Sequence, residues 1–310
     1  MKILYAGTPS FAVAPLKQLV EAGYSVVGVV TQTDKPQGRK GFITPSPVKT
    51  YATEKEIPVY QYDKIRLHAD EVKAIGADVM ITCAYGQILT QEILDAFPKG
   101  VWNIHASLLP RYRGAAPIQW CVLNGEEYTG VTIMKTDIGL DTGDILLVKR
   151  LKIGERETSG ELAARLSALG AEAIVEAMPL IERGAQDLLL QDSSQAFTVK
   201  KITREQAKLD FSLSAREIVN KVRGMNPEPI AYALLNGAPV NVFQAEVCSE
   251  RANEPFGTVV SDSPKKGLIL SCGNGETIKI LEAQMPGGKR VKGSDLLNGR
   301  KITKGQRFDL

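Results

Sequence analysis

Asn103, His105 and Asp141 are the residues whose types and spacing in this sequence are suited to acyl chemistry. Asn103 and His105 stand two residues apart in a short apolar run, so in a strand their side chains point to one face. Asp141 lies in a turn between Gly139 and Gly143. A carboxylate beside an imidazole orients the ring and stabilises its cationic form. With an amide donor added, such a group can bind an oxyanion and move a proton, as acyl transfer to an amine requires.

Each member of this trio also has a purely structural explanation, and the residues alone leave both open. A histidine on a strand is often a hydrogen-bonded core residue, Asn103 can pair with backbone, and Asp141 can simply form a turn. Metal binding is disfavoured because the other histidine, His68, stands alone and no cysteine has ligand spacing. Serine hydrolysis is disfavoured because Ser107 is not in a GxSxG motif.

A parallel sheet would bring these residues together, because ligands bind beyond the carboxyl ends of its strands. Strand-like runs cover residues 2–6, 24–31, 77–85, 101–106, 130–135 and 144–151, with helical spacing between several of them. We therefore expect an α/β fold with a doubly wound, Rossmann-like, mostly parallel sheet. The first turn, residues 7–10, lacks GxGxxG, which argues against a dinucleotide cofactor. Thr90 is expected to cap the following helix, and Thr158 to Glu161 has the capping-box pattern.

A chain of 310 residues fits two domains. The first is predicted to cover residues 1–188, a polar linker residues 189–206, and the second residues 207–310. Short strands are expected in the second domain at 231–235, 240–247, 257–260, 267–271 and 277–284, separated by glycine-rich turns. That pattern predicts a small OB-like β-barrel, a shape often used to hold nucleic acid.

Residues 32–47 form an unusually long segment, for which no secondary structure is expected. It carries the basic residues Lys35, Arg39 and Lys40 against the single acidic residue Asp34. It is either a solvated surface loop or a mobile arm that touches a polyanion.

Composition points to a globular protein, with 44% hydrophobic and 24% charged residues. The net charge of +3 arises in the C-terminal third, where residues 206–310 carry 15 basic and 11 acidic side chains. Four dispersed cysteines are typical of buried thiols in a reducing compartment. No secretory signal or membrane-spanning run is predicted, so we expect a cytoplasmic protein.

The stretch NIHASLLPRYRGAAPI at residues 103–118 resembles the signature of the 10-formyltetrahydrofolate-dependent formyltransferases. GLDTGD at residues 139–144 resembles the second motif of that family. The resemblance covers nearly the whole chain and weakens beyond about residue 205. It implies that Asn103 and His105, the latter as imidazolium, bind the tetrahedral oxyanion. It further implies that Asp141 holds His105 and helps relay the amine proton.

Within that family, the chain is similar to members that formylate initiator methionyl-tRNA. The similar segments are GTPSF at residues 7–11, PSPVK at 45–49 and NPEP at 226–229. Glu228 stands where several relatives have an aromatic residue before proline, so a contact by that ring cannot be carried over. The resemblance implies that the basic arm and the barrel grip tRNA, with contacts from Lys35, Arg39, Lys40, Arg223, Lys289, Arg290 and Lys292.

The resemblance also implies a folate pocket and no metal. Its residues would be Tyr85, Gly86, Gln87, Ile88, Leu89, Ser107, Leu108, Leu109, Pro110, Ile138 and Gly139. We expect a monomer that uses 10-formyltetrahydrofolate as a co-substrate. The alternatives are a nucleotide-sugar formyltransferase, a formyltetrahydrofolate hydrolase, a glycinamide ribonucleotide formyltransferase, or a tRNA-binding protein without catalytic activity.

Overall fold

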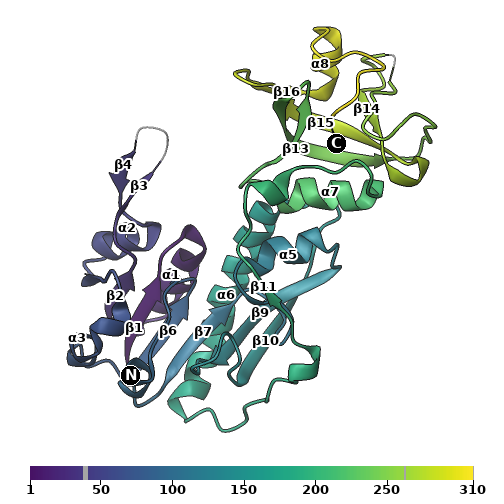
Figure 1. The fold of residues 1–310 in the computed structure, drawn as a ribbon. Helices are drawn as coiled ribbons and strands as arrows, with labels where there is room; N and C mark the ends of the chain where they lie inside the picture. Colours follow the sequence, from purple (N-terminus) through teal and green to yellow (C-terminus); the bar gives the residue numbers. More distant parts are fainter. Residues whose placement is uncertain (38–40, 262, 310) are drawn as a thin grey trace. The chain divides into compact units, whose positions relative to one another are not determined.

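The computed structural model describes residues 1–37, 41–261 and 263–309 of the chain (Figure 1). The chain divides into two compact units, and the second begins its main run at Lys200. Unit 1 holds Met1–Pro117, Tyr128–Lys152 and Ala163–Val199, and unit 2 holds Ile118–Glu127, Ile153–Leu162 and Lys200–Leu310. The boundaries at residues 188 and 207 remain sequence predictions. In the described ranges, no helix is long and apolar enough to cross a membrane.

Unit 1 is built on a seven-stranded sheet. From β1, the chain first adds strands on one side of the sheet and then, from β6 onwards, on the other side. The strands run parallel from β7 to the β5 edge, whereas β9 is antiparallel to both of its neighbours. The order is β10 (Ile145–Lys152), β9 (Tyr128–Lys135), β7 (Val101–His105), β6 (Val79–Cys83), β1 (Lys2–Gly7), β2 (Ser25–Thr31) and β5 (Val59–Gln61). The predicted doubly wound fold is confirmed, with its switch point between β1 and β6.

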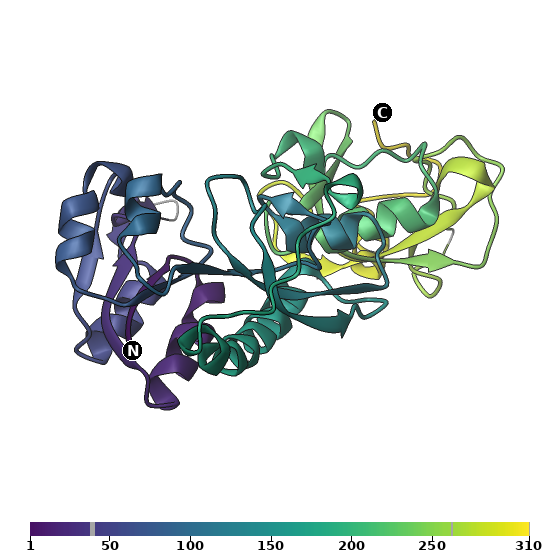
Figure 2. The ribbon, with the colours of Figure 1, turned by 90° about the horizontal axis from the view of Figure 1, so that it is seen from below.

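Helices cover both faces of this sheet because each buried strand presents alternate side chains to either side. On one face, the Tyr5 hydroxyl donates to the Ala12 carbonyl at 2.6 Å, and Gly170 of α6 lies against Ile104. Figure 2 shows α6 beside α1 on that face. On the other face, Leu4 shares a core with Ile93. The first face carries α1 (Val13–Glu21), α2 (Pro47–Glu54) and α6 (Ser159–Glu182), and the second α3 (Ala69–Ala74) and α4 (Gln91–Asp95).

Two of the helix starts test the capping predictions. Before α6, the Thr158 hydroxyl accepts the Glu161 N–H at 3.3 Å, and the Glu161 carboxylate accepts the Thr158 N–H at 2.9 Å. The predicted capping box is therefore confirmed. Thr90 precedes α4 but makes no capping bond. Its hydroxyl is buried and has no hydrogen-bond partner in the described part of the chain, so the predicted side-chain cap is wrong.

The basic arm is a hairpin in its described residues, so the expectation of no secondary structure is wrong there. β3 (Lys35–Gln37) pairs antiparallel with β4 (Phe42–Thr44). Contacts from outside the arm fix its base, because Lys49 lies 2.6 Å and the Gln61 amide 2.8 Å from the carboxylate of Asp34. Local sequence patterns do not reveal such contacts. Arg39 and Lys40 lie outside the described residues.

Unit 2 contains a curled antiparallel sheet with α7 (Ala215–Gly224) packed on it. Its strands are β12 (Ala231–Leu235), β13 (Ala238–Cys248), β15 (Thr277–Gln284) and β14 (Leu268–Ser271), and β16 (Arg290–Lys292) pairs with β15. Isolated bridges join Val259 to Leu270, Thr258 to Arg307 and Leu234 to Asp309. These bridges extend the curled sheet towards a closed barrel. The predicted OB-like class is therefore confirmed.

One strand predicted in unit 2 is wrong, and one strand and one α-helix there were not predicted. Residues 257–260 form bridges but no strand, because Gly257 has a φ of +82°, which interrupts an extended run. β16 and α8 (Gly293–Asn298) follow a turn. Their short sequences show neither the two-residue period of a strand nor the 3.6-residue period of a helix. The remaining elements are α5 (Pro117–Leu123), β8 (Arg113–Gly114), β11 (Thr198–Val199) and the 3-10 turns Ser10–Ala12, Ile65–Leu67, Ser193–Gln195, Glu205–Ala207 and Gly273–Gly275.

Candidate active site

β7 positions two of the three predicted catalytic residues. It lies between β6 and β9, with Asn103 opposite Met134 and His105 opposite Thr132. The alternation of a strand sends the Asn103 and His105 side chains to one face. There both approach Asp141, which lies in the loop between β9 and β10. The structure therefore brings the trio together.

The His105 ring is buried, with 6% of the residue exposed, and both ring nitrogens face oxygen acceptors. Nε2 lies 3.0 Å from the Tyr112 carbonyl oxygen, which can only accept, so Nε2 carries a proton. Nδ1 lies 3.6 Å from Oδ2 of Asp141. Nε2 is thus committed to the backbone, and Nδ1 faces the carboxylate from beyond hydrogen-bond distance.

Asp141 is held through its carboxylate. Oδ2 accepts the Gly114 N–H at 2.8 Å, and Oδ1 accepts from Nδ2 of Asn103 at 3.4 Å. The residue has a φ of +53°, in the left-handed region that aspartate tolerates better than most residues. These contacts fix which way the carboxylate faces. One oxygen turns to the His105 ring while the other receives the amide of Asn103.

The orientation of the Asn103 amide follows from its second partner. Its Oδ1 accepts the Thr82 hydroxyl at 3.0 Å, so Nδ2 must point towards Asp141. One N–H of Nδ2 serves the carboxylate, and the amide retains a second N–H. Asn103 is thus a fixed neutral donor beside the His105 ring.

A tight loop returns the Tyr112 carbonyl to His105. The buried Ser107 hydroxyl donates to the Arg111 carbonyl at 2.8 Å, and the Thr132 hydroxyl donates to the Ser107 carbonyl at 2.7 Å. The Leu109 N–H donates to Thr132 at 3.2 Å. Ser107, Leu109 and Thr132 are all buried. The hydroxyls of Ser107 and Thr132 and the backbone N–H of Leu109 therefore support the site structurally.

The predicted folate residues after β6 are mostly anchored to the fold. Tyr85 and Leu89 are buried, and the Gln87 side chain bonds to the Ile65 N–H and the Tyr62 carbonyl, each at 2.7 Å. Ile88, in contrast, is 78% exposed. Of these side chains, Ile88 is the exposed one, and Gly86 offers only its backbone.

The loop before Asp141 carries the other predicted folate residues. The Asp137 carboxylate accepts the Gly139 N–H at 3.0 Å and the Thr142 hydroxyl at 2.7 Å, which closes the loop on itself. Ile138 and Leu140 then project from it, 67% and 60% exposed. A closed polar loop with two projecting apolar side chains is suited to contact a flat, partly apolar ligand.

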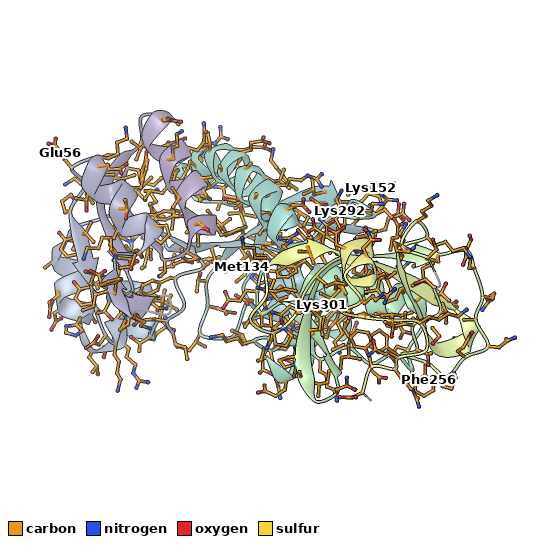
Figure 3. The ribbon with its side chains drawn as sticks, turned by 90° about the horizontal axis from the view of Figure 1, so that it is seen from above. Glu56, Met134, Lys152, Phe256, Lys292 and Lys301 are labelled. Atoms are coloured by element: carbon orange, nitrogen blue, oxygen red, sulfur yellow. The ribbon has the colours of Figure 1, made fainter. Side chains whose placement is uncertain are left out.

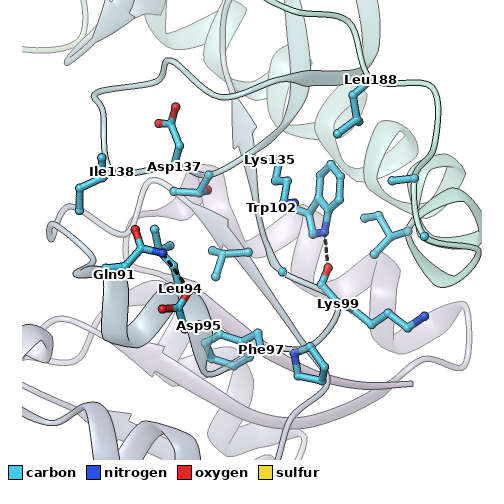
Figure 4. Close-up of a pocket in the computed structure, with 17 residues that line it drawn as sticks. Gln91, Leu94, Asp95, Phe97, Lys99, Trp102, Lys135, Asp137, Ile138 and Leu188 are labelled. Atoms are coloured by element: carbon cyan, nitrogen blue, oxygen red, sulfur yellow. Dashed lines mark hydrogen bonds between the residues drawn. The ribbon is translucent and has the colours of Figure 1, made fainter.

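A cavity of about 630 Å³ lies beside this loop (Figure 4). It is lined by Ile138 but by none of the predicted trio, and its residues Gly100 to Trp102 lie at the start of β7, whereas His105 ends that strand. Its wall is partly aromatic, through Phe97 and Trp102, and carries charge from Lys135 and Asp137. The Trp102 indole is fixed by a 2.9 Å bond to the Lys99 carbonyl. The volume is ordinary for a small-molecule site.

The predicted tRNA contacts have different surroundings. Lys35, Lys289 and Lys292 are exposed, and Figure 3 labels Lys292 at the end of β16. Arg290 is exposed, forms an ion pair with Glu282 and stacks over Phe243 at 4.4 Å.

Arg223 is only 8% exposed, and its guanidinium donates to the Gly154 and Glu157 carbonyls at 2.9 and 3.3 Å. The structure therefore gives Arg223 an internal role, and its tRNA contact remains a prediction.

Four supporting residues were not singled out from the sequence. Thr82 and Thr132 are buried polar residues inside apolar strands, a signal that could have identified them. Tyr112 acts through its backbone carbonyl and Gln191 is remote in sequence, so neither gave a local signal. Within the described residues, no group of three or more His, Cys, Asp or Glu side chains is placed to share a metal ion.

Comparison with known proteins shows the family. The formyl transferase model matches residues 1–178, and the model of the formyl transferase C-terminal domain matches residues 201–301. The chain is 42% identical over 310 residues to a methionyl-tRNA formyltransferase of Bacillus cytotoxicus, covering 99% of this chain and 98% of that protein. A Clostridioides difficile protein of the same name is 42% identical over 307 residues, covering 98% and 99%.

Two solved structures share the fold. The N-formyltransferase from Helicobacter canadensis, in complex with folinic acid and dTDP-3-aminofucose, has a TM-score of 0.68 at 21% identity, covering 90% of this chain and 98% of that one. HypX from Aquifex aeolicus, in complex with tetrahydrofolic acid, has a TM-score of 0.67 at 17% identity, covering 99% and 48%. The resemblance carried by the two sequence motifs is confirmed, and the chain belongs to the formyl transferase family.

Proposed function

We propose that this enzyme transfers the formyl group of 10-formyltetrahydrofolate to the α-amino group of initiator methionyl-tRNA. The observation that carries the proposal is the convergence of Asn103, His105 and Asp141 in one site. The relatives named methionyl-tRNA formyltransferase support the choice of acceptor, because they match this chain from end to end. The reaction would take place in the cytoplasm, with the enzyme acting as a monomer.

The proposed chemistry is direct transfer. The neutral amine attacks the formyl carbon, a C–N bond forms, and the carbonyl oxygen becomes an oxyanion. The bond from that carbon to N10 of the folate then breaks, and the proton lost by the amine ends on N10. The products are formylmethionyl-tRNA and tetrahydrofolate.

Two donors of the site suit the oxyanion. One is the second N–H of Asn103, which the Asp141 carboxylate does not use. The other is Nδ1 of His105, because Nε2 is already bonded to the Tyr112 carbonyl. Nδ1 stands 3.6 Å from the carboxylate, outside hydrogen-bond range, so a protonated Nδ1 would be available to a substrate oxygen. Asp141 would keep the ring charged and oriented and help relay the proton towards N10.

The folate is proposed to lie along the loop before Asp141. Exposed Ile138 and Ile88 would contact its apolar parts, and Asp137 and the backbone of the loop would meet its polar edge. The folates named in the two solved structures support this class of co-substrate.

The acceptor would be held by basic side chains on the arm and on the barrel. The exposed residues Lys35, Lys289 and Lys292 are suited to phosphate contacts, which position a nucleic acid without reading its sequence.

The test is an acceptor comparison with purified enzyme and 10-formyltetrahydrofolate. We expect rapid formylation of methionyl initiator tRNA and no more than background turnover with a dTDP-amino sugar, glycinamide ribonucleotide or water alone. Preferred transfer to the sugar, or release of formate, would replace the proposal with the corresponding alternative. Binding of tRNA without turnover would indicate a non-catalytic tRNA-binding protein.

A further inference from the structure

Gln191 lies in the polar segment that sequence patterns assign to a linker, yet its amide is bonded entirely within the active-site region. Nε2 donates to the backbone carbonyls of Asp141 at 2.9 Å and Gly143 at 2.7 Å. Oε1 accepts from Nε and Nη2 of Arg113 at 3.0 and 2.8 Å. Two N–H donors and both lone pairs are thus used, which is the full capacity of a carboxamide.

These bonds close a ring around the catalytic carboxylate. Arg113 immediately precedes Gly114, whose N–H donates to Oδ2 of Asp141 at 2.8 Å. Gln191 joins the Arg113 side chain to the Asp141 backbone, so the carboxylate and its backbone are tied to the same short strand. The left-handed φ of Asp141 makes this support useful, because that conformation is not the one the residue adopts by default.

Backbone pairing on both sides holds Gln191 in place. Leu189 exchanges two hydrogen bonds with Ile145, each of 2.8 Å. Further along, β11 pairs with β8, and the Arg113 N–H donates to the Phe197 carbonyl at 3.1 Å. The intervening Gln195 is exposed, and its side chain donates to the nearby Asp192 carboxylate at 2.8 Å. Gln191 is therefore set into the site by two anchored flanks.

We infer that Gln191 is a positioning residue that orients the Asp141 carboxylate towards His105. The inference rests on the proposed function for its kinetic part only. The chemistry explains the residue type, because two carbonyls need two donors while the Arg113 guanidinium needs an acceptor. A carboxylate at this position could pair with Arg113 but would face both carbonyls without a proton to donate.

The kinetic test compares Gln191→Glu and Gln191→Ala with the matched control Gln195→Ala. We expect kcat to fall about 10- to 100-fold in both Gln191 variants, the usual cost of losing a supporting hydrogen bond around a reactive group. KM for folate and tRNA should stay within about twofold, and the control should match wild type. A wild-type kcat in both Gln191 variants would overturn the inference.

A double substitution separates positioning from general stability. If Gln191 acts through Asp141, adding Gln191→Ala to Asp141→Asn should leave the single-turnover rate unchanged, because the group being oriented is already lost. A second loss of the same size in that background would show an independent structural role and contradict the inference.

Amide hydrogen exchange tests the same claim without catalysis. In Gln191→Glu and Gln191→Ala, we expect the Gly114 amide to exchange at least about tenfold faster, since its acceptor is no longer held, while Gln195→Ala leaves it unchanged. Unchanged Gly114 protection in both Gln191 variants would refute positioning. The two results can also differ. If the wild-type enzyme formylates no tRNA but the Gly114 amide still exchanges faster in the Gln191 variants, the positioning role stands and the proposed function is rejected.

Discussion

The substitution Asp141→Asn removes one charge and keeps the shape of the side chain. Oδ2 now accepts the Gly114 N–H and Oδ1 the Asn103 amide. An asparagine offers one oxygen and one NH2 group, so one of these two donors must face another donor. The negative charge that Asp141 holds 3.6 Å from the His105 ring is lost at the same time.

The size of the effect follows from that distance. Two unit charges 3.6 Å apart interact by about 4.6 kcal/mol at an effective dielectric constant of about 20. Full loss of that interaction would correspond to about three powers of ten in rate. The Asp141 side chain is 16% exposed, so solvent screens part of it. We therefore expect kcat to fall about 10²- to 10³-fold, the range typical of a lost oxyanion donor.

The assay is formyl transfer to methionyl initiator tRNA at saturating folate, with circular dichroism to confirm folding. Asp187→Asn is the matched control, because Asp187 is an exposed aspartate of the same unit. It should keep wild-type turnover. An Asp141→Asn enzyme with more than about a tenth of wild-type kcat would refute the electrostatic reasoning, since the loss would then be under about 1.4 kcal/mol.

Three further predictions concern other parts of the chain. Arg223→Met should lower the free energy of unfolding by about 2–4 kcal/mol, measured by urea denaturation, because buried carbonyl acceptors lose their donor; a higher KM for tRNA at unchanged stability would instead support the tRNA contact. Burial raises the pKa of the Cys83 thiol from 9.0 to about 12, so its contribution to stability is present below pH 9 and lost as pH rises towards 12. The free energy of unfolding, measured by urea denaturation, should accordingly fall less steeply between pH 9 and 11 in Cys83→Ala, by about 1.4 kcal/mol per pH unit, and equal slopes would count against the shift. Charge reversal at Arg39 and Lys40, outside the described residues, should weaken tRNA use and reduce its salt slope by about 2, with KM for folate unchanged; unchanged tRNA kinetics would argue against the arm.

The parts of the fold that sequence predicted correctly depend on local pattern. β12 and β15 have the predicted bounds because alternation and flanking turns define them. The convergence of Asn103, His105 and Asp141 was predictable because two motifs contain them. The expectation that a parallel sheet gathers them at one edge is wrong for Asp141, because β9, the strand before it, is antiparallel to β7.

The parts that sequence missed depend on distant contacts. Gln191 lies in a polar stretch without periodicity, and its role appears only when Asp141, fifty residues earlier, is placed beside it. Arg223 occupies the last turn of a helix, where a basic residue is usually exposed, but packing within unit 2 buries it. The arm pairs as a hairpin although Pro36 and Gly41 discourage strand formation locally.

The most direct test of formyl transfer to methionyl-tRNA is the fate of an isotope-labelled formyl group in a single turnover with methionyl initiator tRNA. We predict that all transferred label is recovered on the α-nitrogen of tRNA-bound methionine, with one tetrahydrofolate released for each formyl group. Recovery of the label as formate, or a methionyl-tRNA that remains unlabelled while folate is bound, would contradict it.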